Sequence, residues 1–129
     1  MNIGEAAAAT GLPAKTIRYY ESVGLIDPPA RSGGNYRRYD ERHLATLRFI
    51  QHARRLGFSV KEVTALVALW RDKRRASADV RRLASAHLDE IDARIAELKR
   101  MRQTLQGLVE RCHGDRRPDC PILEGLDRG

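Results

Sequence analysis

Apolar residues recur at helical spacing along most of the chain, and capping or helix-breaking residues divide the pattern into segments. Asn2 suits the N-cap of a first helix that runs through Ala9 and ends at Gly11. Pro13 suits the first turn of a second helix that continues to about Val23. Two short helices joined by a glycine-containing turn are typical of a helix-turn-helix.

The pattern changes between residues 28 and 39, where tyrosines and arginines alternate. Gly and Asn residues at 33–35 mark the tip of a hairpin, and the alternation marks its return strand, which predicts a wing. Asp40 then suits the N-cap of a helix over 41–56, and Ser59 suits the N-cap of the helix that follows. The first part of the chain therefore predicts a winged helix-turn-helix.

A long helix is predicted to start at Ser77, and its apolar residues recur from Val80 through Leu108 in steps of mostly three and four. A helix of about thirty residues with one apolar seam leaves too little of the chain to cover that seam. We therefore expect the same helix of a second subunit to pair with it, as an antiparallel coiled coil in a homodimer. The alternative is that the seam packs back onto the head of its own chain. Residues 124–129 are expected to form a mobile tail.

Charge is distributed unevenly along the chain. Residues 1–75 carry 14 Lys and Arg against 7 Asp and Glu, whereas residues 76–129 carry 10 of each. A basic head on a neutral body is typical of a protein that binds a polyanion, most commonly nucleic acid, although a solvated basic surface would look the same. We expect a mainly α fold with a winged helix-turn-helix DNA-binding region at 1–75, a long dimerisation helix at 76–110, and a metal-binding loop with its tail at 111–129.

Side chains suited to DNA lie on the second helix, on the predicted wing and near the end of the next helix. They are Lys15, Thr16, Arg18 and Tyr19, then Arg31, Tyr36 and Arg37, then Arg54. Such side chains can bond phosphate oxygens, which positions a protein on DNA. An alternative for Tyr36 and Tyr39 is that both pack the hairpin onto the helices. An alternative for Arg54 and Arg55 is that both are solvated charges at a helix end.

The two cysteines of the chain, Cys112 and Cys120, both lie near its C-terminal end. Seven mostly polar residues separate them, including Gly114 and Pro118, which predicts a loop that brings two sulfurs to one soft metal ion. The chain has neither a secretion signal nor the roughly 18 to 20 consecutive apolar residues of a membrane span, so we expect it in the cytoplasm, without a membrane partner. In that reducing compartment a disulfide is disfavoured, which leaves free thiols, metal-bound thiolates or a redox switch.

Three segments of the sequence resemble the MerR family of bacterial transcriptional regulators. They are Thr-Ile-Arg-Tyr-Tyr-Glu-Ser-Val-Gly-Leu at 16–25, Asn-Tyr-Arg-Arg-Tyr at 35–39 and Arg-Arg-Leu-Gly-Phe-Ser at 54–59. Within that family, Ser-Ala-Asp-Val at 77–80 and the cysteine segment at 112–124 most resemble the copper-efflux regulators of the CueR type. Those regulators respond to Cu(I), Ag(I) and Au(I).

The resemblance implies a homodimer whose heads bind successive grooves of double-stranded promoter DNA that has an overlong spacer. It implies that the metal-free dimer keeps the promoter inactive. Metal binding then bends and untwists the DNA so that RNA polymerase can start transcription, which for the copper-efflux type means copper and silver resistance genes. In physical terms the ion shifts a population toward the activating conformation.

Two soft thiolates suit Cu(I), whereas structural zinc normally has four ligands. His113, Asp115 and Asp119 could complete a divalent site. The resemblance implies that the position of Ser77 is a cysteine of the other subunit in divalent-metal relatives, so its replacement here removes a third sulfur. A further hypothesis is that the start of that subunit's long helix, with Ser77 and Arg81, offsets the negative charge of two thiolates around one monovalent ion.

Other functions stay open at this point. One is a MerR-type regulator that responds to zinc, cadmium or lead, and another is a thiol-redox sensor that works without metal. A third is a metal chaperone or thiol enzyme with an incidental basic surface. The sequence contains neither a set of nucleophile, base and acid nor a phosphate-binding glycine loop, so we do not expect an enzyme.

Overall fold

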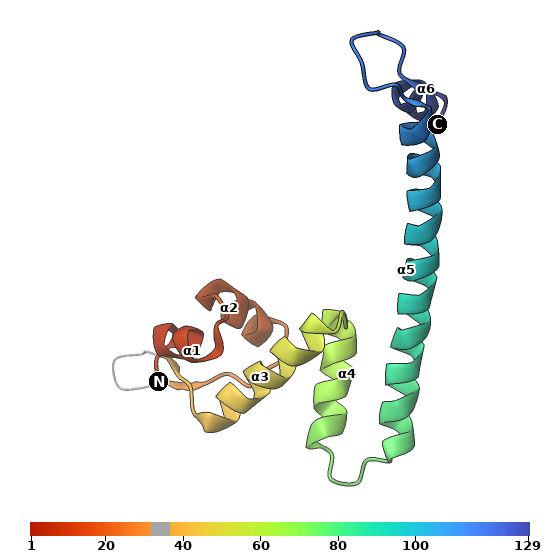
Figure 1. Ribbon diagram of the computed structural model, residues 1–129. Helices are drawn as coiled ribbons and strands as arrows, with labels where there is room; N and C mark the ends of the chain where they lie inside the picture. The colour runs from red at the N-terminus through yellow and green to blue at the C-terminus, as the bar shows by residue number, and fades with distance from the viewer. Residues whose placement is uncertain (32–36) are drawn as a thin grey trace. The chain divides into compact units, whose positions relative to one another are not determined.

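A computed structural model describes residues 1–31 and 37–129, and its elements are mainly helical (Figure 1). In chain order they are α1 (Ile3–Thr10), α2 (Ala14–Ser22), β1 (Ala30–Arg31), β2 (Arg37–Arg38), α3 (Glu41–Arg55), α4 (Val60–Arg71), α5 (Ser77–Arg111) and α6 (Pro121–Arg128). The chain divides into two compact units, Met1–Leu83 and Ala84–Gly129. The predicted wing tip at 33–35 and Tyr36 lie outside the described residues. The expected functional division at residue 75 stays a prediction.

The first unit begins with the predicted helix-turn-helix, formed by α1 and α2. The Asn2 side chain accepts a hydrogen bond from the Glu5 N–H at 2.8 Å, and the Glu5 carboxylate accepts one from the Asn2 N–H at 3.2 Å. Gly11 ends α1 with a φ of 73°, a left-handed conformation that glycine adopts without strain. Pro13 is the N-cap of α2, one position before the helix in which it was expected.

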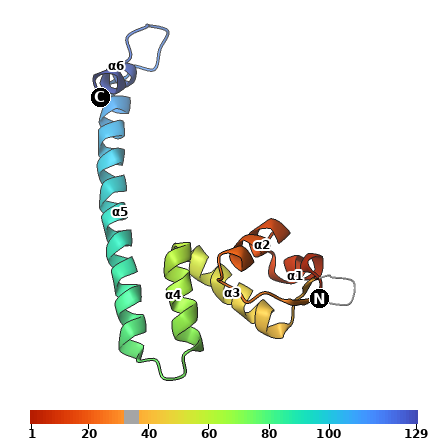
Figure 2. The same ribbon diagram turned by 180° about the vertical axis from the view of Figure 1, so that it is seen from behind.

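The core of this unit joins α2, α3 and α4. Fully buried side chains lie on one face of each helix; they are Ile17 on α2, Leu44, Leu47 and Ile50 on α3, and Val63 on α4, with Leu25 and Ile26 from the turn after α2. Figure 2 shows α1, α2 and α3 from behind, grouped as in the first view. Burial of these apolar side chains stabilises the head and fixes which face of α2 is left exposed.

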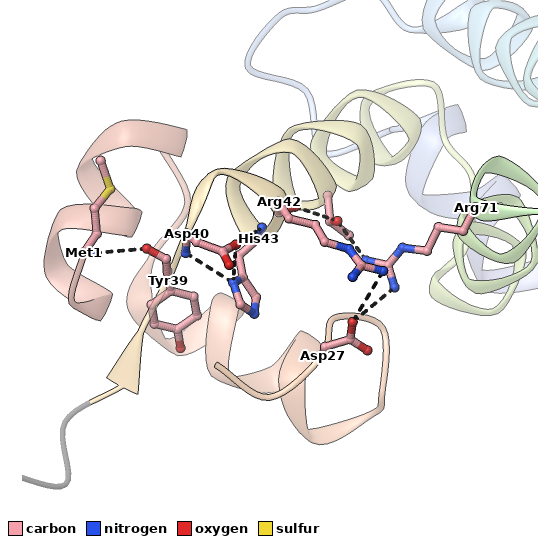
Figure 3. Close-up of polar contacts among 8 residues, drawn as sticks. Met1, Asp27, Tyr39, Asp40, Arg42, His43 and Arg71 are labelled. Atoms are coloured by element: carbon pink, nitrogen blue, oxygen red, sulfur yellow. Dashed lines mark hydrogen bonds and ion pairs between the residues drawn. The ribbon is translucent and has the colours of Figure 1, made fainter. Parts of the chain in front are cut away.

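The hairpin is tied to the start of the chain. Strands β1 and β2 pair antiparallel, with Arg31 opposite Arg37. Just after β2, the Tyr39 N–H donates to the Met1 carbonyl at 2.6 Å and the Met1 nitrogen donates to the Tyr39 carbonyl at 2.9 Å (Figure 3). The Tyr39 ring is buried and its hydroxyl donates to Glu21 Oε2 at 3.1 Å. Tyr39 therefore packs the hairpin onto the helices, as the packing alternative proposed.

A polar network links the end of α4 to the rest of the first unit (Figure 3). Arg71, the last residue of α4, donates from Nη2 to the buried Thr46 hydroxyl on α3 at 2.9 Å. Its Nη1 lies 3.6 Å from Asp27 Oδ2, in the turn after α2, and Arg42 Nη2 lies 4.0 Å from the same oxygen. Three segments that are distant in sequence are thus joined through one guanidinium group.

The second unit contains the rest of α5 and the short helix α6, which folds back against the end of α5 (Figure 1). Helix α6 corrects the expectation of a mobile tail at 124–129, because residues 121–128 are helical. An added Cβ on Gly125 would lie 2.6 Å from Leu108 Cδ2, so the glycine allows α6 to approach Leu108 closely. Among the described residues, no helix combines the length and the apolar character needed to span a membrane.

Candidate DNA interface and metal-binding loop

Helix α2 separates its buried face from its exposed face. Ile17 and Tyr20 are buried in the core, whereas Lys15 and Arg18 are exposed. Tyr19 is 50% exposed, and its ring centroid lies 6.0 Å from that of Tyr20. Two cations and a phenol therefore face outward together on α2, as predicted from the sequence.

Thr16 differs from the other predicted contact residues on this helix, because it is half-buried. On the hairpin, the backbones of Arg31 and Arg37 are paired across β1 and β2. Tyr36 lies outside the described residues. The predicted DNA contacts of Thr16 and the hairpin residues stay predictions.

Arg54 has a structural contact that the sequence did not indicate. Its Nη1 donates to the Phe58 carbonyl at 2.7 Å, and this hydrogen bond stabilises the turn between α3 and α4. Its side chain is exposed, and a guanidinium group carries five N–H donors, so further donors are available for a phosphate. Arg54 is thus not merely a solvated charge, while its predicted contact with DNA stays a prediction.

Asp40, shortly after the hairpin, is a charged N-cap for the first turn of α3. Asp40 Oδ1 accepts from the His43 N–H at 3.0 Å and lies 2.8 Å from His43 Nδ1, as Figure 3 shows. The backbone hydrogen bond from His43 is the main reason why the pKa of Asp40 is lowered from 3.8. Histidine here occupies the position that Glu or Gln usually takes in a capping box.

The two cysteines occupy the ends of two helices. Cys112 directly follows the last residue of α5, and its N–H donates to the Val109 carbonyl at 3.1 Å. Cys120 is the N-cap of α6, and its carbonyl accepts from the Glu124 N–H at 3.0 Å. Both thiols are free and half-buried. The loop predicted from the cysteine spacing therefore connects α5 to α6 and places one cysteine at each of its ends.

The three other side chains considered as ligands, His113, Asp115 and Asp119, are all exposed. Asp115 is bound to Arg117, whose backbone N–H donates to Oδ1 at 2.9 Å and whose Nε donates to Oδ2 at 2.8 Å. In the described part of the chain, no group of three His, Cys, Asp or Glu ligand atoms within 4.8 Å of one another includes Cys112 or Cys120.

Ser77 and Arg81 lie at the other end of α5. Ser77 is its first residue and Arg81 follows one turn later, and both are exposed. The predicted contribution of Ser77 and Arg81 of a second subunit to the metal site stays a prediction.

Comparison with known proteins places these features in a family. A family profile described as "MerR HTH family regulatory protein" matches residues 1–69, and one described as "MerR, DNA binding" matches residues 44–108. The chain is 57% identical to the HTH-type transcriptional regulator HmrR of Rhizobium leguminosarum bv. viciae, over all of this chain and 99% of that protein. It is 45% identical to the HTH-type transcriptional regulator CueR of Salmonella typhimurium, over 98% of this chain and 91% of the relative.

A solved structure is similar over nearly the full length. It is the transcription regulator PbrR691 from Ralstonia metallidurans CH34 in complex with lead(II), with a TM-score of 0.85 and 34% identity, covering 98% of each chain. The relatives named here are transcriptional regulators. The family profiles and these relatives show that this chain belongs to the MerR family of helix-turn-helix transcriptional regulators and is not an enzyme.

Proposed function

We propose that this protein is a metal-responsive regulator that binds promoter DNA as a homodimer and activates copper and silver efflux genes. Its signal is Cu(I), Ag(I) or Au(I) bound between Cys112 and Cys120. The observation that supports the proposal is the loop between α5 and α6, which has one half-buried cysteine at each end. In the described part of the chain, no group of three ligand atoms includes either thiol. Such a donor set suits a soft monovalent ion better than zinc.

The site needs compensation for its charge, because two thiolates around one monovalent ion leave a net negative charge that is costly to bury. Cys120 lies at the N-cap of α6, where unpaired backbone N–H groups and the helix dipole favour an anion. The start of α5 in a second subunit, with Ser77 and Arg81, adds further backbone N–H groups and a positive charge that favour the anion. The sulfur atoms come from this chain, and part of the positive field comes from its partner.

Homodimerisation follows from the unpaired surface of α5. Apolar side chains are exposed along this helix; they are Leu88, Ile95, Leu98, Met101, Leu105 and Val109, with exposures from 45% to 60%. Their spacing forms one seam, and pairing this seam with that of a second copy removes it from water. An antiparallel arrangement also brings the start of one α5 beside the end of the other, as the metal site requires.

The head supplies the contact with DNA. Lys15, Arg18 and Tyr19 present an exposed face of α2 to the major groove, while Arg31 and Arg37 on the hairpin bind phosphate. Two heads in a dimer bind two half-sites, which gives a palindromic promoter site. The bound ion favours the dimer conformation that bends and untwists the DNA, so that RNA polymerase in the cytoplasm can use the promoter.

A divalent-metal regulator is the second candidate. It is favoured by the similarity to PbrR691, whose solved structure contains lead(II). The position of Ser77 separates the two candidates, because serine offers no thiolate to complete a divalent site. A thiol-redox regulator is the third, and it would respond to oxidant without metal.

In vitro transcription tests this proposal. The DNA site of the protein is first selected from a random duplex library and then placed between overspaced polymerase elements. Transcription is measured with reduced protein and Cu(I), Ag(I), Zn(II) or Pb(II). Activation by Cu(I) and Ag(I) alone is the expected result. Activation by Zn(II) or Pb(II) instead would support the second candidate, and activation by an oxidant without metal would support the third.

A further inference from the structure

The loop between the cysteines contains one internal ion pair, between Asp115 and Arg117. The two contacts of Arg117, from its backbone N–H at 2.9 Å and from Nε at 2.8 Å, engage both carboxylate oxygens of Asp115. Asp115 follows Cys112 by three residues, so it is a carboxylate inside the segment that the two sulfurs enclose. Both oxygens of this carboxylate are therefore in contact with Arg117.

The chemistry of the two donor types gives this contact a consequence. Carboxylate oxygens are hard ligands that suit divalent ions, whereas thiolates suit soft monovalent ions. A divalent ion that recruits Asp115 competes with Arg117 for the carboxylate and brings its own positive charge close to the guanidinium group. A two-coordinate monovalent ion uses the sulfurs alone and leaves the pair intact. Specificity depends on the difference between the binding free energies of the two ions. A contact that weakens the binding of divalent ions alone therefore changes the ratio of the divalent to the monovalent affinity.

We propose that Arg117 is a specificity-determining residue, which holds the Asp115 carboxylate away from the metal and thereby lowers the affinity of the loop for divalent ions. This inference rests on the proposed binding of metal by Cys112 and Cys120. The proposed effect of Arg117 is on the ratio of the Zn(II) affinity to the Cu(I) affinity, in addition to the effect of the two sulfur ligands. Arg116 provides a matched control, because it is exposed, has the same charge and lies one residue away.

The test is an anaerobic competition titration of the full-length reduced protein with Zn(II) and with Cu(I), each against a chelator. Arg117→Gln removes the charged Nε contact to Asp115 Oδ2 and keeps the backbone N–H contact to Oδ1. We expect the Zn(II) affinity of this variant to rise up to about fivefold, since the pair is exposed and exposed ion pairs are weak. Arg116→Gln removes the same charge and leaves the contact, so a smaller change is expected. Cu(I) affinity changes by less than about twofold in either variant.

A double variant identifies the group responsible. In Arg117→Gln combined with Asp115→Asn, the gain in Zn(II) affinity disappears, because the freed side chain is no longer a carboxylate. Equal Zn(II) affinities of Arg117→Gln and Arg116→Gln would overturn the inference, and so would a gain that persists in the double variant. Failure of the proposed function would give a different result. The Cys112→Ser, Cys120→Ser protein would then bind each metal as tightly as the wild type does. Circular dichroism of each variant checks that the helices are retained.

Discussion

Cys120 combines two roles that can be separated by substitution. It is a proposed metal ligand, and it is also the N-cap of α6, although its side chain makes no capping hydrogen bond. Cys120→Ser removes the sulfur and introduces a better capping side chain. We expect the Cu(I) affinity to fall by more than about a hundredfold. Substitution of residues that only hydrogen-bond to metal ligands already lowers metal affinity by about 10- to 100-fold, and loss of a ligand should cost more. Amide exchange in α6 should remain as slow or become slower.

Chelator competition and hydrogen exchange measure these two effects on one sample. Cys120→Ala serves as the control, since it removes the sulfur without adding a cap. An unchanged Cu(I) affinity in both variants would exclude Cys120 as a ligand. Faster exchange in the serine variant than in the alanine variant would contradict the capping argument.

Asp40 predicts a specific dependence of stability on pH. Its pKa is lowered from 3.8 in the folded protein, mainly by the backbone hydrogen bond from His43. A carboxyl group with a depressed pKa stabilises the fold above its unfolded pKa, and this contribution is lost as the pH falls through the folded value. Below pH 3.8 the wild type should therefore lose stability relative to Asp40→Asn, which keeps a capping oxygen but does not ionise. Thermal unfolding of both proteins between pH 3 and 7 measures this, and parallel curves would contradict it.

The residues that were predictable from sequence are those that act locally. Asn2, Asp40 and Ser59 were assigned as N-caps because a cap and its partner lie within one helical turn. The contact of Tyr39 with Glu21 joins residues 18 apart. The burial of Tyr39 depends on that contact between distant segments, so the local sequence left its role open.

At the scale of elements, α6 shows why a short helix can be missed when helices are predicted from the spacing of apolar residues. It has only eight residues, it contains Gly125, and no side chain caps its start. Glycine inside a helix costs about 1 kcal/mol, so propensity alone argues against α6. Its packing against Leu108, which is 8% exposed, supplies an apolar contact that the local sequence does not show. The long helix α5 was predictable because its repeat extends over many turns.

The end of α4 is held by Arg71. Its ion pair with Asp27 contributes little, because Asp27 is 62% exposed, so the bond to the buried Thr46 hydroxyl dominates. We expect Arg71→Ala to lower the free energy of unfolding by about 1 to 2 kcal/mol. Arg48→Ala is the control, because Arg48 is an exposed arginine on α3. Urea unfolding that gives equal losses for the two variants would contradict a role for the network.

At the scale of the whole molecule, the exposed seam of α5 predicts that the dimer is the functional unit. Leu98 is 60% exposed in a single chain, and a two-fold dimer buries it twice. Leu98→Lys should weaken the dimer by about a hundredfold or more, because each buried leucine contributes at least about 1.5 kcal/mol. Sedimentation velocity of this variant should detect monomers at concentrations where the wild type is dimeric.

Gln103→Lys is the matched control for that experiment, because Gln103 is exposed on the same helix away from the seam. It should remain dimeric, and the far-ultraviolet circular dichroism of both variants should match that of the wild type. A wild type that is monomeric at micromolar concentration would contradict the dimer. The proposed metal site would then lack the Ser77 and Arg81 of a second subunit.

The central feature of the proposed function is the binding of a monovalent ion by the two thiols. The most direct measurement is an anaerobic titration of the reduced protein with Cu(I) and, separately, with Zn(II), each against a competing chelator, and repeated on Cys112→Ser, Cys120→Ser. We expect tight Cu(I) binding at one ion per thiol pair, loss of this binding in the double variant, and much weaker binding of Zn(II). Tighter binding of Zn(II) than of Cu(I), or Cu(I) binding that survives loss of both cysteines, would contradict it.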